Sequence, residues 1–67
     1  MSTFRERLKE LREEKNLFHK DVAKALSVTR SAYSGWEQGR REPDIYTLKL
    51  IAKFFGVTVG YLVGAED

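Results

Sequence analysis

The amino-acid sequence predicts an all-α fold, a compact bundle of five short helices that forms one domain over residues 1–67. Apolar residues recur at helical spacing in successive segments, and residues that favour helix ends lie between them. No segment shows the alternation of apolar and polar residues that is typical of a half-buried strand. A chain of 67 residues is long enough for one domain, so the helices must share a single core.

The first helix is expected at about 3–15. Thr3 and Glu6 have the spacing of a capping box, in which each side chain accepts a hydrogen bond from the other residue's backbone N–H. Asn16 tolerates the left-handed backbone that often ends a helix. The inward stripe of this helix is expected at Phe4, Leu8 and Leu11.

A second helix at about 19–26 and a third at about 30–38 are expected to be joined by a tight turn at 27–29. Thr29 is suited to cap the third helix and Gly39 to end it. The side chains expected to point inward are Val22, Ala23, Leu26, Tyr33 and Trp36, with Val28 filling the corner of the turn.

The last two helices are also bounded by residues typical of helix ends. Asp44 is the expected N-cap of a fourth helix that stops at Gly56, and Thr58 is the expected cap of a short fifth helix. Their inward side chains are expected to be Ile45, Leu48, Ile51, Ala52, Phe55, Val59, Leu62 and Val63.

Composition excludes several classes of function. The chain has no Cys and a single His, so it can form neither disulfides nor thiolate-bound zinc, and His19 alone cannot complete a metal site. We therefore expect no metal, no cofactor and no small-molecule ligand. The sequence contains no apolar run of about 18 residues, and its N-terminal segment is charged, so we expect no membrane span, no signal peptide and a cytoplasmic protein.

Positive charge is concentrated in the middle of the chain. The net charge is only +2, but residues 19–41 carry five Lys and Arg side chains against two carboxylates, and the remainder is slightly acidic. Clustered cations are typical of a surface that binds a polyanion. A basic surface without a partner is the alternative interpretation.

A helix, a three-residue turn and a helix, with the small residue Ala23 in the first helix and Val28 in the turn, is the helix-turn-helix arrangement. A closer likeness is carried by five segments in order along the chain, which read LREEKNL, VAKAL.V, S.WE.GRREP, TL..IAK.FGV and V.YL.G. By these segments the chain resembles the lambda-repressor-like (Xre) helix-turn-helix domain over nearly its whole length. The helix-turn-helix unit would then lie at about 19–38.

The resemblance implies a sequence-specific regulator of transcription that binds double-stranded DNA. It further implies a repressor that binds a pseudo-palindromic operator as a homodimer, with the third helix in the major groove. An ion pair between Arg12 and Glu37 is implied between helices one and three. The residues implied to face the bases are Thr29, Arg30, Ser31, Ser34 and Gly35. The residues expected to contact phosphates are His19, Lys20, Gln38, Arg40 and Arg41.

The chemistry of these residue types agrees with those roles. Arg30 has the fork geometry to donate two hydrogen bonds to guanine O6 and N7, although it can also be a solvated helix charge or a phosphate clamp. Ser31 and Ser34 can each donate or accept a hydrogen bond, so their side chains do not indicate which base they would contact. We expect Gly35 to let the duplex approach closely. We do not expect His19 to be a catalyst or a pH switch, because nothing near it in sequence would orient it.

The chain departs from the family pattern at four positions. Phe18 stands where Ser or Thr usually caps helix two, and Ser27 stands at a turn position often held by Gly, where left-handed backbone would be strained. Tyr33 is bulkier than the usual Ile or Val. His19 replaces a Gln, which puts the phosphate contact of that position in doubt.

A second apolar stripe runs along the fourth helix at Tyr46, Leu50 and Phe54, spaced i, i+4 and i+8. Together with the inward stripe it makes this helix apolar on two sides, so we expect both sides to be covered. The cover is expected to be either the last helix, with Tyr61, or a second copy of the chain in a dimer built from the last two helices. The face of that dimer would be Tyr46, Leu50, Phe54 and Tyr61.

Two other classes of function are alternatives to a DNA-binding regulator. The same bundle could serve as a protein-interaction module or as an antitoxin-type component. Enzymatic activity has the least support, because the sequence contains no recognisable nucleophile and base pair, phosphate loop or metal cluster.

Overall fold

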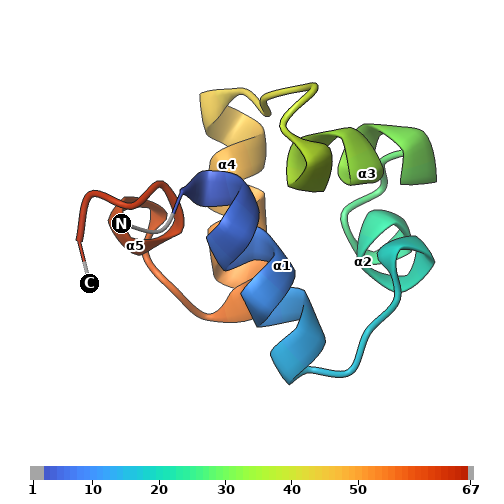
Figure 1. Cartoon of the computed structure of the whole chain (residues 1–67), viewed down its shortest axis with the longest axis horizontal. Helices are drawn as coiled ribbons and strands as arrows, with labels where there is room; N and C mark the ends of the chain where they lie inside the picture. The colour runs from blue at the N-terminus through green and yellow to red at the C-terminus, as the bar shows by residue number, and fades with distance from the viewer. Residues whose placement is uncertain (1–2, 67) are drawn as a thin grey trace.

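In this computed structural model the described residues, 3–66, form five α-helices and no strand, as the sequence predicts (Figure 1). α1 crosses the middle of the molecule, with α2 and α3 on one side of it and α5 on the other (Figure 1). The helices are α1 (Phe4–Glu14), α2 (His19–Ala25), α3 (Arg30–Gln38), α4 (Ile45–Phe55) and α5 (Val59–Leu62). Positions 1, 2 and 67 of the expected domain lie outside the described residues.

The ends of α1 have the expected chemistry. The Glu6 backbone N–H donates to Thr3 Oγ1 over 3.4 Å, and the Thr3 backbone N–H donates to Glu6 Oε1 over 3.1 Å, which completes the capping box. Hydrogen bonds from the Thr3 hydroxyl and backbone lower the pKa of the Glu6 carboxyl. After α1, Asn16 has a φ of 56°, in the left-handed region.

α2 begins without a side-chain cap at its N-cap residue. The carboxylate of Asp21 compensates in part, since the Phe18 backbone N–H donates to Asp21 Oδ2 over 2.8 Å. At the other end of α2, Ser27 has a φ of 58°, so the strained backbone considered from the sequence is present. The turn then leads into α3, where the Ala32 N–H donates to Thr29 Oγ1 over 3.0 Å.

The remaining helices begin at residues whose side-chain oxygen caps the helix, and two of them end at glycine. Gly39 and Gly56 end α3 and α4 with φ values of 76° and 70°. Asp44 caps α4 by accepting from the Thr47 N–H over 2.8 Å, which lowers the pKa of the Asp44 carboxyl. Thr58 caps α5 by accepting from the Tyr61 N–H over 2.9 Å.

All five helices contribute to one core, and most of its members are the residues expected from the helical spacing. Two expectations are wrong. Ile45 is 66% exposed because it is the first residue of α4, beyond the edge of the core, and Val63 is 43% exposed because it follows the last residue of α5. The buried apolar side chains are Leu8, Leu11, Val22, Ala23, Tyr33, Trp36, Ile51, Ala52, Phe55 and Leu62.

A buried arginine that the sequence did not indicate joins the two ends of the described chain. Arg7 is only 9% exposed, and its Nη1 donates to the carbonyl oxygens of Tyr61 over 2.9 Å and of Glu66 over 2.8 Å. Its guanidinium carbon lies 4.3 Å from the centroid of the Tyr61 ring. These contacts hold α5 and the segment after it against α1.

Candidate functional site

The exposed part of the helix-turn-helix unit is the beginning of α3. Thr29 is the N-cap, Arg30 and Ser31 lie in the first turn, and all three residues are exposed. Arg30 lies beside α2, where it lines an open hollow with Phe18 and Lys20. Three of the five residues expected to face the bases therefore lie on an open surface, with Lys20 beside Arg30.

Gly35, which the sequence predicts to face the bases and to let a duplex approach closely, does not lie on that open surface. The residue is buried, and a Cβ added to it would lie 2.9 Å from Cδ and 3.0 Å from Cγ of Arg41. The Gly35 carbonyl accepts hydrogen bonds from the backbone N–H groups of Arg40, over 2.9 Å, and Arg41, over 3.2 Å. The absent side chain leaves room for the stem of Arg41 to fold back over α3.

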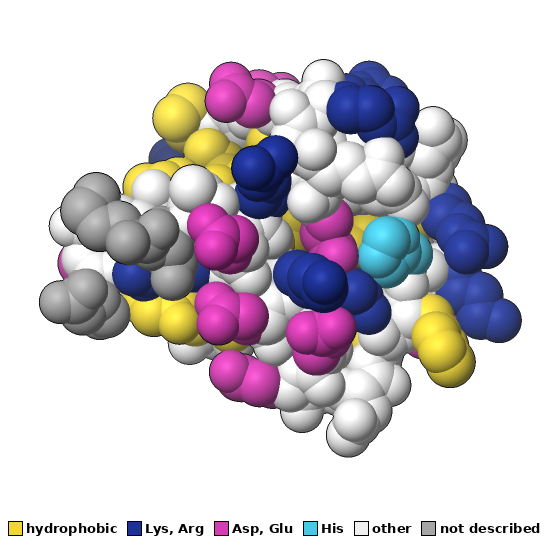
Figure 2. Space-filling model, in the orientation of Figure 1, with side chains coloured by type: hydrophobic (Ala, Val, Ile, Leu, Met, Phe, Trp, Pro, Cys, Tyr) yellow, Lys and Arg dark blue, Asp and Glu magenta, His cyan; other side chains and the backbone are white. Residues whose placement is uncertain are grey.

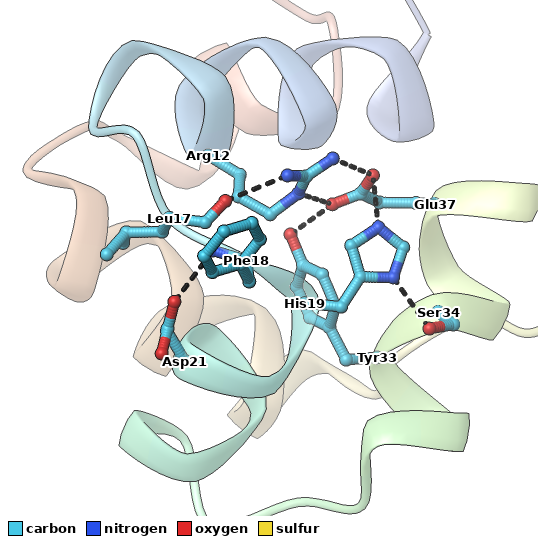
Figure 3. Close-up of polar contacts among 8 residues, drawn as sticks. All are labelled: Arg12, Leu17, Phe18, His19, Asp21, Tyr33, Ser34 and Glu37. Carbon is cyan, nitrogen blue, oxygen red and sulfur yellow. Dashed lines mark hydrogen bonds and ion pairs between the residues drawn. The ribbon is translucent and has the colours of Figure 1, made fainter.

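Ser34 is half-buried, and its hydroxyl is held by a neighbour from α2. His19 Nδ1 lies 2.7 Å from Ser34 Oγ, and His19 Nε2 lies 3.3 Å from Glu37 Oε1 (Figure 3). The imidazole also meets the edge of the Tyr33 ring, with 5.4 Å between ring centroids. His19 is thus oriented by three side chains of α3, all of them distant from it in the sequence.

These contacts also bear on the phosphate contact expected of His19. Both ring nitrogens face groups of the same chain, and 27% of the side chain is exposed. His19 therefore connects α2 to α3 within the protein. Its exposed edge, visible in cyan between the two helices in Figure 2, is what remains for an external partner.

The Arg12 and Glu37 pair implied by the resemblance is present. Arg12 Nε donates to Glu37 Oε2 over 2.7 Å and Nη2 donates to Oε1 over 3.1 Å (Figure 3). Arg12 Nη1 also donates to the Leu17 carbonyl over 2.9 Å, so one guanidinium ties α1 to both α3 and the loop before α2. The two side chains are only 13% and 5% exposed.

Burial and hydrogen bonding shift the pKa values in this cluster. Burial alone would raise the pKa of Glu37, but hydrogen bonds from Arg12 and Tyr33 outweigh it, so this pKa lies below its ordinary value. The hydrogen bond to Glu37 raises the pKa of Arg12. Burial, followed by the hydrogen bond that its hydroxyl donates to Glu37, raises the pKa of Tyr33. Glu37 is therefore a carboxylate at neutral pH, and Tyr33 is a neutral phenol.

The other residues expected to contact phosphates lie at the two ends of α3. Lys20 of α2 is exposed beside Arg30, at the beginning of α3. Gln38, Arg40 and Arg41 are exposed at the end of α3, where Arg40 Nε donates to Gln38 Oε1 over 2.7 Å. In Figure 2 lysine and arginine side chains follow the edge formed by α2 and α3, while most carboxylates of this face lie over α1. The charge of the surface thus has the arrangement that a polyanion requires.

Arg5 is a further cation of this surface that the sequence did not indicate. Its Nη1 lies 3.5 Å from the Gln38 carbonyl oxygen, and Arg5 and Arg41 line the same hollow beside Gly39. The distance along the chain hid this neighbour, since Arg5 precedes Gln38 by 33 residues. No local signal in the sequence could have placed it there.

The apolar stripe of α4 is not covered by α5, which excludes that alternative. Tyr46 is 71% exposed, and Leu50 and Phe54 are each 37% exposed. They line an open hollow of about 630 Å³ whose opposite wall is residues 25–28 at the end of α2. Tyr61 does not line this hollow and packs against Arg7 instead.

Within 3–66 no three His, Cys, Asp or Glu side chains are grouped so that they could hold a metal ion. In the same part of the chain, no helix has the length and apolar character needed to cross a membrane.

Residues 8–62 match the model of the family described as helix-turn-helix. Over 64 residues the chain is 44% identical to the HTH-type transcriptional activator BcrR of Enterococcus faecalis, covering 96% of this chain and 31% of that protein. It is 33% identical over 64 residues to the cryptic phage CTXphi transcriptional repressor RstR of Vibrio cholerae, covering 96% of this chain and 58% of the relative.

The fold is also similar to that of a solved structure. A transcriptional regulator from Listeria innocua superimposes with a TM-score of 0.89 at 29% sequence identity, covering 97% of this chain and 61% of the other. The chain therefore spans less than two thirds of the length of each of these three proteins.

Proposed function

Because the chain belongs to the helix-turn-helix family, we propose that it binds double-stranded DNA through α3 and regulates transcription. The observation that carries the proposal is the exposed start of α3, with Thr29, Arg30 and Ser31 on an open surface and cations at both ends of the helix. The names of the relatives as transcriptional regulators support the same function.

In this proposal the start of α3 reads bases in the major groove. Arg30 donates two hydrogen bonds to the O6 and N7 atoms of a guanine, a contact that contributes about 1 to 3 kcal/mol of discrimination. Ser31 and Ser34 offer hydroxyls to neighbouring base edges, and the Thr29 methyl group suits the methyl group of a thymine. Gly35 acts through Arg41, whose side chain it accommodates, and touches no base.

Phosphate binding in this proposal comes from cations beside α2 and at the end of α3. The residues that the sequence predicts to contact phosphates are His19, through its exposed edge, and Lys20, Gln38, Arg40 and Arg41. Arg5 is added to this set because it lies beside the Gln38 carbonyl. Such contacts supply most of the affinity and fix the register of α3, but they carry little sequence information.

A second copy of the chain is the proposed partner of the apolar stripe on α4. One α3 helix of nine residues can read only a few base pairs, so two copies on a pseudo-palindromic operator double the contacts. The exposed Tyr46, Leu50 and Phe54 offer the apolar surface that such an interface needs. The two α3 helices would then enter successive major grooves about 34 Å apart.

We further propose that the chain acts as a repressor, because a dimer seated in the major groove excludes polymerase from the same duplex. An operator selected in vitro and placed across a promoter tests this direction. Transcription from that promoter should fall as the protein is added, and a rise would assign the chain to activation instead.

The apolar hollow beside α4 also favours a second candidate function, a protein-interaction module or antitoxin-type component. In that case the hollow binds a different protein. An antitoxin-type component would still read DNA through α3, whereas an adaptor would not. The cations along α2 and α3 have no use in such an adaptor, which is why we place DNA binding first.

Titration of a labelled mixed-sequence duplex at increasing salt separates the two functions. DNA binding predicts that the logarithm of the affinity falls linearly with the logarithm of the salt concentration, by about 0.9 per phosphate contacted. Arg41→Ala should weaken all duplexes alike and reduce this slope by about one, whereas Lys9→Ala, on an exposed position of α1, is the control that should leave it unchanged. Absence of binding at any salt concentration would favour the interaction module.

A further inference from the structure

The contact between His19 and Ser34 places a titratable ring against a hydroxyl of the proposed DNA-reading helix. His19 Nδ1 lies 2.7 Å from Ser34 Oγ, within hydrogen-bond distance, and the ring is held on its other side by Glu37. No local pattern indicates this arrangement, because His19 and Ser34 are 15 positions apart in the chain. The inference below rests on the proposed function of α3.

Glu37 fixes which ring nitrogen carries hydrogen when the imidazole is neutral. The carboxylate is ionised and can only accept, so Nε2, 3.3 Å from Glu37 Oε1, must carry the hydrogen. Nδ1 then has a lone pair and accepts from the Ser34 hydroxyl. The hydroxyl hydrogen is thereby used inside the protein, and Ser34 presents only lone pairs to a partner.

Protonation of the ring reverses this hydrogen bond. An imidazolium carries hydrogen on both nitrogens, so Nδ1 donates to Ser34 Oγ and the hydroxyl hydrogen is released. Ser34 can then donate to an external acceptor. We infer that His19 is a positioning residue for DNA recognition, which sets by the charge of its ring whether the Ser34 hydroxyl can only accept, or can also donate, at a base edge.

The groups that face His19 carry charges of both signs. From α3, the Glu37 carboxylate lies against the ring, and Tyr33, a neutral phenol, makes a T-shaped contact with it. From α1, Arg12 shares the same carboxylate. Lys20 follows His19 in α2. Histidine is the side-chain type whose charge ordinarily changes between about pH 5 and pH 8.

Base-edge chemistry converts the two states into two preferences. A hydroxyl that can only accept fits the amino groups of adenine and cytosine, whereas a hydroxyl that can also donate fits in addition the acceptors of guanine and thymine and the N7 atom of adenine. At the one base position contacted by Ser34, the preference for A or C over G or T at high pH should therefore weaken at low pH.

Selection from a pool of duplexes with a randomised centre tests this at about pH 5.5 and about pH 8. The ratio of the two base classes at the Ser34 position should change on the order of fivefold, the size expected for one hydrogen bond. Ser34→Ala identifies the position, since its preference there should disappear at both pH values. Circular dichroism at both pH values verifies that each protein is folded.

His19→Gln is the matched variant. Its amide NH₂ can donate to Glu37 and its carbonyl can accept from Ser34, so it mimics the neutral ring at every pH. This variant should select the high-pH preference under both conditions. Identical selections by the wild type at both pH values, or a pH-dependent change that persists in His19→Gln, would overturn the inference.

Nitrogen NMR of the ring gives a second test that needs no variant. The chain has one His, so its two ring nitrogens can be assigned without ambiguity. At high pH the hydrogen should be found on Nε2, and a neutral ring with its hydrogen on Nδ1 would also overturn the inference. If no duplex sequence is enriched at either pH, the proposed function of α3 has failed instead, and the two failures are distinguishable.

Discussion

The side chain of Glu37 joins three helices through its polar contacts. It accepts from Arg12 of α1, faces His19 of α2, and accepts from Tyr33 in its own helix. Only 5% of its side chain is exposed, so the negative charge is stabilised by these partners rather than by water. Loss of this carboxylate would leave Arg12 mostly buried and without its partner.

Glu37→Gln is therefore expected to lower the free energy of unfolding at neutral pH by about 3 kcal/mol, as removal of one partner of a buried ion pair does. It should also change the acid dependence of stability. The pKa of Glu37 is lowered by folding, so its contribution is fully present above the ordinary carboxyl pKa of 4.5 and is lost as pH falls through the lower folded value.

Urea unfolding at several pH values below neutrality measures both effects. The wild type should lose more stability than Glu37→Gln as pH falls below 4.5. Glu6 and Asp44, whose pKa values are also lowered, remain in both proteins and cancel in the comparison. Equal acid dependence in the two proteins would show that Glu37 does not contribute in this way.

Gly35 makes the link between stability and binding testable at one position. Gly35→Ala should raise the free energy of unfolding by up to about 1 kcal/mol through helix propensity, because the atoms it meets belong to the flexible Arg41 side chain, which can move aside. The same movement takes the Arg41 guanidinium from its place, so affinity for all duplexes should fall.

A double-mutant comparison identifies the cause. In an Arg41→Ala background, Gly35→Ala should no longer weaken duplex binding, because the side chain that it displaces is already gone. A further loss of affinity in that background would mean that the DNA backbone itself approaches Gly35, as the sequence first indicated.

Local sequence was sufficient to predict most helix ends, because caps depend on residues within one turn of each other. Thr3, Thr29, Asp44 and Thr58 each cap a helix as predicted. The errors at Ile45 and Val63 occur at the ends of stripes, where helical spacing indicates a direction but does not indicate where the neighbouring helix stops. Contacts between distant segments, such as Arg7 with the carbonyls after α5, have no local pattern that could predict them.

Among residues 3–66, two that are not glycine have left-handed backbone. They follow α1 and α2, and they differ in how well they tolerate this conformation. Asn16 has a φ of 56° and Ser27 a φ of 58°. Left-handed backbone costs most residues about 1 to 2 kcal/mol, and Asn less than most. Ser27→Gly is therefore expected to raise the melting temperature more than Asn16→Gly does.

Ser31→Gly is the control for this comparison. It introduces the same chemical change within α3, where backbone is helical, and should lower stability by about 0.5 to 1 kcal/mol. If Ser27→Gly also lowered the melting temperature, the entropy that glycine adds to the unfolded chain would outweigh the strain at the turn.

The arrangement of all five helices leaves α4 with one apolar side toward the core and one toward solvent. The stripe of Tyr46, Leu50 and Phe54 was predictable from spacing alone. What lies opposite it was not, because the wall at residues 25–28 depends on how α2 and α4 meet in space. An open apolar hollow of this kind is typical of a surface that binds another protein.

Leu50→Glu tests whether that protein is a second copy of the chain. A charge at the centre of the stripe should weaken self-association by about 30-fold, the size of a central interface contact. Lys49→Glu, at an exposed neighbouring position on the same helix, is the control and should leave the dimer intact. Sedimentation equilibrium over a range of protein concentrations measures both.

The proposed dimer makes a linked prediction for DNA. Leu50→Glu should reduce binding to a duplex that carries two half-sites about 34 Å apart, while binding to a single half-site stays unchanged, because α3 lies outside the altered surface. A wild type that sediments as a monomer yet binds both duplexes with equal affinity would remove the second copy from the proposal and leave the hollow for a different protein. A monomer that dimerises only on the two-site duplex would support the second copy as the partner, since the operator then supplies the local concentration that a weak interface needs.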